Sequence, residues 1–247
     1  MSKRKGTVAV VGAGDHIGAA IVKKFAAEGY TVFAGRRNGD KLAPLKAEVA
    51  AAGGTCETRT LDARNEAAII AFLAEANHVA PLDLVVFNVG GNVYAPILET
   101  TERVFRKVWE MACYAGFLTG REAAKHMVDN GRGAIFFTGA TASMRGGKGF
   151  VAFGAAKAGL RSVAQSLARE LGPQNIHVAH LIIDSGVDTA FVRERIRARE
   201  GDAAIANLEP DRLMNPASIA EAYWHMFNQP RDAWTFEMDL RPYKETW

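Results

Sequence analysis

A glycine-rich turn directly after the first apolar segment limits the fold of this chain more than any other feature. Residues 7–11 are apolar or β-branched, which is typical of a buried strand, and Gly12 follows at once. Ile17, Ile21 and Phe25 then recur at helical spacing. This order of strand, turn and helix places free N–H groups of the helix beside the turn, where they can bind an anion. We therefore expect an α/β fold with an anion site at this turn.

Strand-like and helical segments alternate along the rest of the chain. Further strands are expected at residues 30–34, 56–61, 82–87, 134–137, 177–183 and 235–240. Helical patterns lie at residues 102–130, 152–171, 191–206 and 216–228. Such alternation favours parallel strands with helices on both faces of the sheet. We predict a doubly wound (Rossmann), mostly parallel, seven-stranded α/β sheet, formed by residues 1–247 as one domain.

Charge and composition argue against several classes of function. The 30 basic and 27 acidic residues leave a net charge of +3 without a long run of either sign, so we expect no nucleic-acid partner. The apolar run after the basic residues 1–6 is too short for a signal peptide, and no run approaches the ~20 residues of a membrane span. Cys56 and Cys113 are too few for a disulfide framework. We expect a cytoplasmic protein with a small-molecule substrate and no membrane partner.

The turn at residues 11–18, V-G-A-G-D-H-I-G, resembles the T-G-x-x-x-G-I-G motif of the short-chain dehydrogenase/reductase family. Val11 replaces the threonine and His16 replaces the middle glycine. The His16 imidazole can either crowd a bound pyrophosphate or donate a hydrogen bond to it, and Gly14 gives the loop freedom to adjust. A tight turn without a ligand is the alternative. The resemblance assigns the cofactor pyrophosphate to Gly12, Gly14, His16, Ile17 and Gly18.

Two arginines follow the second expected strand. A carboxylate there would bind the ribose hydroxyls of NAD, whereas an arginine can pair with the 2′-phosphate of NADP. The resemblance implies NADP, with Arg36 at the phosphate and Arg37 stacked on the adenine. Asp15 argues for NAD, because NADP-preferring relatives often carry a basic residue near that position. Two solvated arginines are the alternative.

Further matches extend the resemblance over residues 7–240. Outside the glycine turn it assigns the cofactor to Asp62, Asn88, Gly90, Val187 and Thr189. Two departures lie nearby. Residues 88–90 resemble the family's Asn-Ala-Gly turn, and Phe87 stands where the family has a further asparagine before it. Asp184-Ser185 replaces a Pro-Gly pair, so the loop after residue 183 can run differently.

The catalytic positions match poorly. Family members use a Tyr-x-x-x-Lys pair on one helix, an upstream serine and an asparagine on the preceding long helix, and the tyrosine donates the proton. Lys157 matches the lysine, but Phe153 stands at the tyrosine position, Ala140 at the serine position and Cys113 at the asparagine position. Phenylalanine has no proton to donate. Lys157 can still bind the nicotinamide ribose, or it can be an ordinary solvated lysine.

A replacement acid must therefore come from another side chain. The candidates are Thr141, Ser143, Tyr114 and Cys113. Each has a structural alternative. A loop serine or threonine usually closes a turn, a helix tyrosine usually packs, and a lone buried cysteine usually fills apolar space.

Three functions fit the sequence. The first is an NADP-linked oxidoreductase that transfers hydride with a non-standard proton donor. The second is nucleotide binding without turnover, as a sensor or an inactive partner, and the third is a lyase or isomerase on the same fold. A metal site is not expected, because His177 and His180 face opposite sides of a strand. The helices at 102–130 and around Lys157 resemble the family's dimer interface, which implies a homodimer or homotetramer.

Overall fold

The computed structural model describes residues 6–245, so the basic N-terminal segment 1–5 and residues 246–247 lie outside it. Seven parallel strands form one sheet in the order β3-β2-β1-β4-β5-β6-β7. The strands are β1 (Thr7–Val11), β2 (Thr31–Arg36), β3 (Thr55–Thr60), β4 (Leu82–Phe87), β5 (Gly133–Thr138), β6 (Ile176–Ile183) and β7 (Glu237–Leu240). The predicted doubly wound seven-stranded sheet is confirmed, and its parallel strands all end at the same edge.

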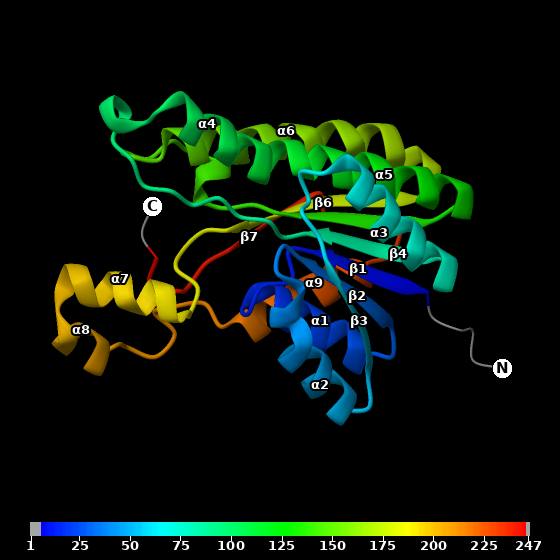
Figure 1. Ribbon diagram of the computed structural model, residues 1–247, viewed down its shortest axis with the longest axis horizontal. Coiled ribbons are helices and arrows are strands. Elements are labelled where there is room, and N and C mark those ends of the chain that lie inside the picture. The colour runs from blue at the N-terminus through cyan, green and yellow to red at the C-terminus, as the bar shows by residue number, and fades with distance from the viewer. Residues whose placement is uncertain (1–5, 246–247) are drawn as a thin grey trace.

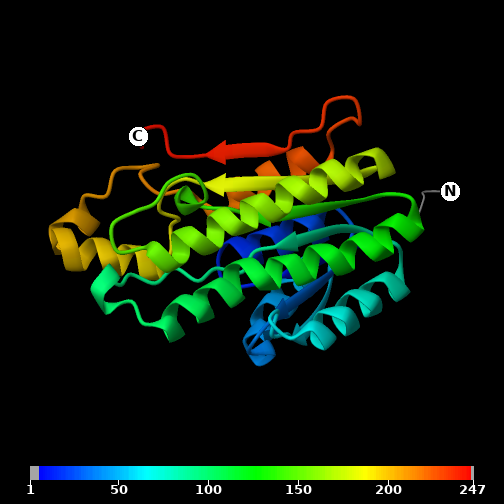
Figure 2. The ribbon, with the colours of Figure 1, turned by 90° about the horizontal axis from the view of Figure 1, so that it is seen from above.

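Helices cover both faces of the sheet. They are α1 (Ile17–Ala27), α2 (Ala43–Ala51), α3 (Glu66–Val79), α4 (Glu102–Trp109), α5 (Ala115–Asn130), α6 (Val151–Leu171), α7 (Ala190–Glu200), α8 (Asp202–Ala206) and α9 (Pro216–Phe227). Figure 1 shows α3, α4, α5 and α6 above the sheet, and α1, α2 and α9 below it. Seen from above in Figure 2, α3, α5 and α6 lie side by side, while α7 and α8 project beyond one end of the layers.

Alternate residues of the central strands supply two separate cores. Val8 and Val10 of β1 pack on the side of α1 and α9, whereas Ala9 and Val11 pack on the side of α3, α5 and α6. All four side chains are fully buried. A strand that is buried on both faces needs apolar side chains at successive positions. This explains why residues 7–11 form a continuous apolar run.

The two long predicted helices behave differently. The segment 102–130 is helical throughout, but a π-helical turn at Glu110–Tyr114 joins α4 to α5. The prediction of a single helix over 191–206 is wrong, because Gly201 separates α7 from α8 with a φ of +87°. That value lies in the left-handed region, which glycine enters at little cost and which an α-helix cannot contain.

No helix in residues 6–245 is long and apolar enough to cross a membrane.

A partly buried polar cluster connects α6 to the last two strands. Arg161 of α6 forms a two-pronged ion pair with Glu237 of β7, at 2.6 and 2.7 Å. The same carboxylate lies 3.1 Å from Nδ1 of His180, which is fully buried in β6. Burial outweighs the attraction of Glu237 and lowers the pKa of His180 to about 4. His180 is therefore neutral at pH 7.

This burial predicts acid sensitivity. Because the pKa of His180 is lower in the folded chain than in the unfolded chain, its contribution to stability is present above its ordinary pKa and is lost as the pH falls through about 4. We expect the free energy of unfolding to fall by about 3 kcal/mol from this group between pH 7 and pH 4. His180→Gln removes that part of the fall in urea titrations, and His78→Gln, at an exposed site, does not. An unchanged slope in His180→Gln would contradict the assignment.

Candidate nucleotide and substrate site

A groove runs along the sheet edge where the parallel strands end. Its larger part is a cavity of about 630 Å³ and its smaller part a cavity of about 520 Å³. The two parts share Gly12, Gly14, Asn88, Val89 and Gly90. Of the predicted site residues, the larger part is also lined by His16, Ile17, Gly18, Ala140, Thr141, Phe153, Lys157, Val187 and Thr189. The smaller part is also lined by Arg36, Arg37 and Asp62.

The glycine turn brings β1 and α1 into close contact with β4. Gly12 has a φ of +94°, and a Cβ atom there would lie 2.8 Å from the backbone carbon of Asn88. A Cβ atom on Gly18 would lie 2.6 Å from the carbonyl oxygen of Gly12. Gly14 faces open space instead, so nothing in the protein itself requires a glycine there. Ile17 and Gly18, the first two residues of α1, line the groove, so the N-terminus of this helix borders it, as an anion site requires.

Asn88 fixes this turn from the neighbouring strand. Its Nδ2 donates a hydrogen bond to the carbonyl oxygen of Gly12 at 3.0 Å, and its backbone N–H donates to Val11 at 2.8 Å. The side chain therefore stabilises the groove wall as well as lining it.

Basic side chains surround the smaller part of the groove. Arg36, the last residue of β2, forms an ion pair with Asp15 of the glycine turn at 2.5 Å. Arg37 and Lys41 also line this part. Asp62, which also lines this part, accepts two hydrogen bonds of 2.6 and 2.9 Å from the Arg64 side chain.

The Arg64 guanidinium lowers the pKa of the Asp62 carboxyl. Asp62 is therefore an ionised acceptor whose two oxygens already bind Arg64.

Lys157 of α6 is buried in the larger part. Only 3% of its surface is exposed, and its Nζ donates to the backbone carbonyls of Thr138 at 2.7 Å and Val89 at 3.3 Å. Burial without a carboxylate partner lowers its pKa to about 8. The Lys157 ammonium also lies 5.9 Å from the centre of the Phe153 ring. The alternative of a solvated lysine is wrong, because burial is almost complete.

The three residues at the other predicted catalytic positions pack together in an apolar cluster. Phe153 and Cys113 belong to one buried cluster with Val108, Ala112, Ala152 and Ala156, and Ala140 packs against it. Burial raises the pKa of the Cys113 thiol. Its Sγ also limits the space at Gly159 on α6, where a Cβ atom would lie 2.8 Å away. Cys113 thus fills space between two helices, and it does not line the cavity.

Only Thr141 of the four candidate acids lines the cavity. Ser143 is buried and its Oγ accepts a hydrogen bond from the Ala140 N–H at 3.1 Å, closing the short helical turn Thr141–Ser143. Tyr114 stacks between Trp109 and Phe117 along the outer helices. Ser143 therefore closes a turn and Tyr114 packs against aromatic rings, which are the structural roles expected for them as alternatives to catalysis.

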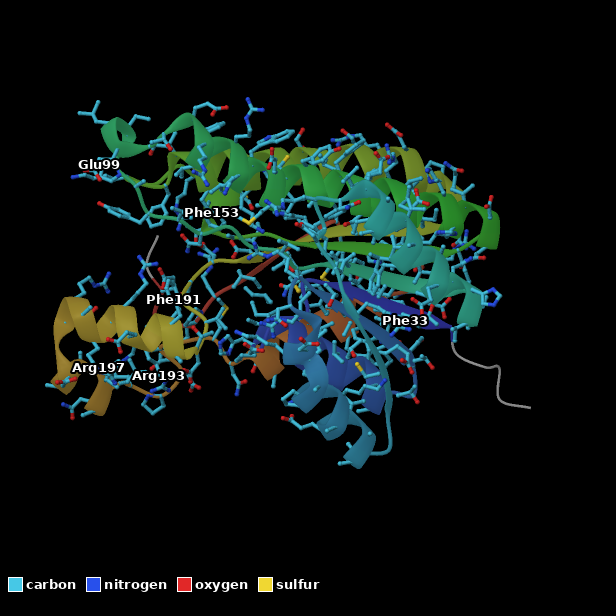
Figure 3. All side chains as sticks on the ribbon, in the orientation of Figure 1. Phe33, Glu99, Phe153, Phe191, Arg193 and Arg197 are labelled. Atoms are coloured by element: carbon cyan, nitrogen blue, oxygen red, sulfur yellow. The ribbon has the colours of Figure 1, made fainter. Side chains whose placement is uncertain are left out.

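The loop after β6 borders the larger part on its far side. Thr189 caps α7, since its Oγ1 accepts a hydrogen bond from the Val192 N–H at 3.1 Å, and Val187 pairs with Met214 in an isolated bridge. Asp184, where the Pro-Gly pair was expected, is almost fully buried and pairs with Arg145. Figure 3 shows Phe191 on the side of α7 that faces the Phe153 end of α6, with Arg193 and Arg197 on its opposite side.

Comparison with known proteins decides the family. The family model described as short chain dehydrogenase matches residues 6–200, which is most of the chain. This chain is a short-chain dehydrogenase family member.

Similar proteins carry dehydrogenase, oxidoreductase or reductase descriptions. A crystal structure of a short-chain dehydrogenase from Rhodopseudomonas palustris is 60% identical, with a TM-score of 0.82, and the match covers 96% of this chain and 99% of that one. The 3-oxoacyl-(acyl-carrier-protein) reductase MabA of Mycobacterium tuberculosis is 29% identical, over 87% of this chain and 82% of its own length. A metagenomic short-chain oxidoreductase solved in complex with NADP is 26% identical, with a TM-score of 0.79, over 99% of this chain and all of that one.

Several residues of this short-chain dehydrogenase site were not predicted. Arg145 and Phe150 line the larger part, and Lys41 and Arg64 line the smaller part. The segment 144–150, which matches the family motifs poorly, was expected as a whole to set the size and polarity of the substrate, together with 191–209, but neither Arg145 nor Phe150 was singled out as a site residue. The basic character of residues 36–41 and the nearby Arg64 could have been noticed beside Arg36 and Arg37.

The burial of Lys157 carries a cost in stability that can be measured. Its pKa is lower in the folded chain, so the unfolded chain binds more protons between about pH 8 and 10.5 and stability rises with pH across that window. We expect this group to raise the free energy of unfolding of the wild type by about 3 kcal/mol between pH 7 and 10.5, and Lys157→Met to abolish the rise. Urea titrations across that range measure the change.

Lys23→Met is the matched control, since Lys23 is half exposed on α1. A Lys157→Met variant that is less stable at pH 7 would show that the two carbonyl contacts outweigh the burial of the charge.

Proposed function

We propose that this short-chain dehydrogenase is an NADP-linked oxidoreductase that transfers hydride to or from a carbonyl or alcohol substrate with a non-standard proton donor. The observation that carries the proposal is that the glycine turn, Arg36 and Lys157 line one continuous groove, while Phe153 closes its reacting end without a polar group. The family and its oxidoreductase relatives support this class of reaction. Residues 1–247 would form one dinucleotide-binding domain.

The groove fits an NADP cofactor in its charge as well as in its shape. The N–H groups of α1 would hold the pyrophosphate, and Arg36, Arg37 and Lys41 would surround the 2′-phosphate. Asp15 does not favour NAD here, because it already pairs with Arg36 and holds the guanidinium at the mouth of the groove. The NADP seen in the 26% identical structure is consistent with this assignment.

Each side chain around the reacting end would have a limited role. The nicotinamide would supply or accept the hydride when bound. Lys157, held by two backbone carbonyls, would donate hydrogen bonds to the nicotinamide ribose and fix its position. The Thr141 hydroxyl would donate a hydrogen bond to the substrate oxygen, and water would supply the proton, because Phe153 has none to donate.

The predicted homodimer or homotetramer and the cytoplasmic location stay predictions. Trp109 and Phe117 are exposed and stack on the half-buried Tyr114, in the segment that the family resemblance assigns to the subunit interface.

Cofactor preference tests the role of Arg36. We expect Arg36→Ala to weaken NADPH binding at least about tenfold and to leave NADH binding nearly unchanged, because only NADPH carries the 2′-phosphate that the guanidinium would bind. Isothermal titration calorimetry with each cofactor measures the change. Arg59→Ala is the control, since Arg59 pairs with Glu75 outside the groove. Equal losses for both cofactors would contradict the assignment.

The missing tyrosine can be put back. We expect the wild type to oxidise NADPH with at least one member of a panel of aldehydes and ketones, and Phe153→Tyr with Ala140→Ser to change that rate little, because the natural site delivers the proton by another route. Thr141→Val should lower kcat about tenfold or more. Nicotinamide absorbance follows each reaction.

If only the tyrosine variants turn over carbonyls, the natural chain is not a reductase of this kind and nucleotide binding without turnover becomes the better description.

A further inference from the structure

We propose that the substrate of this site carries a phosphate group remote from its reacting carbon, and that Arg195 of α7 binds that phosphate. The proposal rests on the hydride-transfer function above and names the class of molecule on which that function acts. Its basis is a second cavity, called here the basic cavity, which adjoins the larger part of the groove and is lined by several arginines.

The basic cavity lies between α7 and the segments that follow β6 and β7, and its volume is about 1400 Å³. Asn92, Ser185 and Val187 line both this cavity and the larger part of the groove, so the two spaces adjoin. Figure 1 shows the chain that follows β7 passing close to α7. A substrate whose carbonyl oxygen lies at Thr141 can therefore extend past Asn92 into the basic cavity.

Basic side chains outnumber acidic ones on the walls of this cavity. Its described lining residues include four basic and two acidic side chains, Arg195, Arg199, Arg212 and Lys244 against Glu209 and Glu245. Lys244 pairs with Glu209, and Glu245 accepts a hydrogen bond of 2.7 Å from the Ser185 hydroxyl. The Glu200 carboxylate pairs with both Arg199 and Arg212. One carboxylate shared by two guanidinium groups leaves a positive charge at that wall.

Arg195 is the basic residue of this cavity whose charge no acid offsets. Its guanidinium carbon lies 5.8 Å from the centre of the Phe191 ring, one turn earlier on α7. Within residues 6–245, no carboxylate forms an ion pair with the Arg195 side chain. A guanidinium that lies over a ring keeps its five N–H donors available, because they lie in its own plane. Arg195 can therefore bind an anion in the cavity.

The spacing of the arginines on α7 suits a phosphate group. Arg195 and Arg199 are four residues apart, so their side chains lie on one face of the helix with Cβ atoms about 6 Å apart. Figure 3 shows Phe191 on the side of α7 towards the Phe153 end of α6, and Arg197 on the opposite side. A phosphate carries about two negative charges and three strong acceptor oxygens, so it can bind two guanidinium groups at once.

The walls of the basic cavity also offer apolar surface to the rest of such a substrate. Val187 lies at the junction with the groove, and Phe191, Val192 and Leu213 line the basic cavity with it. These side chains suit an apolar linker. We therefore expect several carbon atoms between the carbonyl group and the phosphate.

Binding of unreactive ligands tests the phosphate site without any turnover. The probes are butyl, hexyl and octyl phosphate, each paired with the alkyl methyl sulfone of the same chain length, whose tetrahedral head group is uncharged. They are titrated by calorimetry into the NADP-saturated protein, so that the cofactor fills its own phosphate sites. We expect at least one phosphate to bind about tenfold or more tightly than its sulfone, the scale of one charge-assisted hydrogen bond. The proposal is wrong if every sulfone binds as tightly as its phosphate.

Variants assign the preference to Arg195. Arg195→Met should lower the ratio of phosphate to sulfone affinity about tenfold, whereas Arg195→Lys, which keeps the charge, should retain part of it. Arg195 is exposed, so its replacement leaves no buried charge without a partner. Arg197→Met is the matched control, because it removes the same charge from the opposite side of the same helix and should leave the ratio unchanged. An unchanged ratio in Arg195→Met, or an equal loss in Arg197→Met, overturns the proposal.

A diester probe separates two sources of the phosphate. Hexyl phosphate carries about two negative charges near pH 7, and hexyl methyl phosphate carries one. Tighter binding of the monoester would support a phosphorylated small molecule, and equal binding of both would support a phosphodiester link to a larger carrier. In both cases the loss of affinity in Arg195→Met is the result that supports the site.

Turnover separates this proposal from the function on which it rests. The substrates are hexanal and octanal with a phosphate on the last carbon, each paired with the aldehyde that carries a methyl sulfone there. We expect Arg195→Met to raise KM for the phosphorylated aldehydes alone and to change kcat little, because the phosphate is remote from the reacting carbon. Equal losses of kcat/KM for both kinds of aldehyde would overturn the phosphate assignment. Phosphate binding through Arg195 without any NADPH oxidation would leave the ligand class standing and remove the hydride-transfer function.

Discussion

The structure around the predicted site depends on the hydrogen bonds of one buried ammonium group. Lys157 reaches from α6 to the carbonyl oxygens that follow β4 and end β5, so a single side chain connects a helix to two strand ends. No carboxylate of the described residues compensates its charge, and its depressed pKa measures the cost. A folded chain tolerates such a cost only where other contacts, or a ligand, make up for it.

Apolar side chains pack near this lysine. Phe153, Ala140 and Cys113 occupy positions where the family resemblance expects three hydrogen-bonding side chains, and together they build one apolar wall.

The sequence was informative where local rules govern the structure. The glycine turn, the buried strands and the position of Arg36 at the end of β2 all follow from patterns within about ten residues, and the structure agrees with them. The sequence did not predict contacts between residues that are far apart along the chain. Nothing near Asp184 in the chain indicates that Arg145 and Arg241 will flank it. The break at Gly201 was missed because helical periodicity continues on both sides of it.

The π-helical turn between α4 and α5 has a consequence for any alignment or redesign of this segment. Such a turn holds one residue more than an α-helical turn, so all of α5 is rotated by about 100° relative to an unbroken continuation of α4. That rotation directs Gly116 and Gly120 at Leu160, Phe137 and Leu167, with no space for a Cβ atom. Deleting any one residue of Glu110–Tyr114 would restore an even helix and turn both glycines away from α6. The irregular turn therefore sets the rotational phase of the helix, and with it the distance at which α5 and α6 can pack.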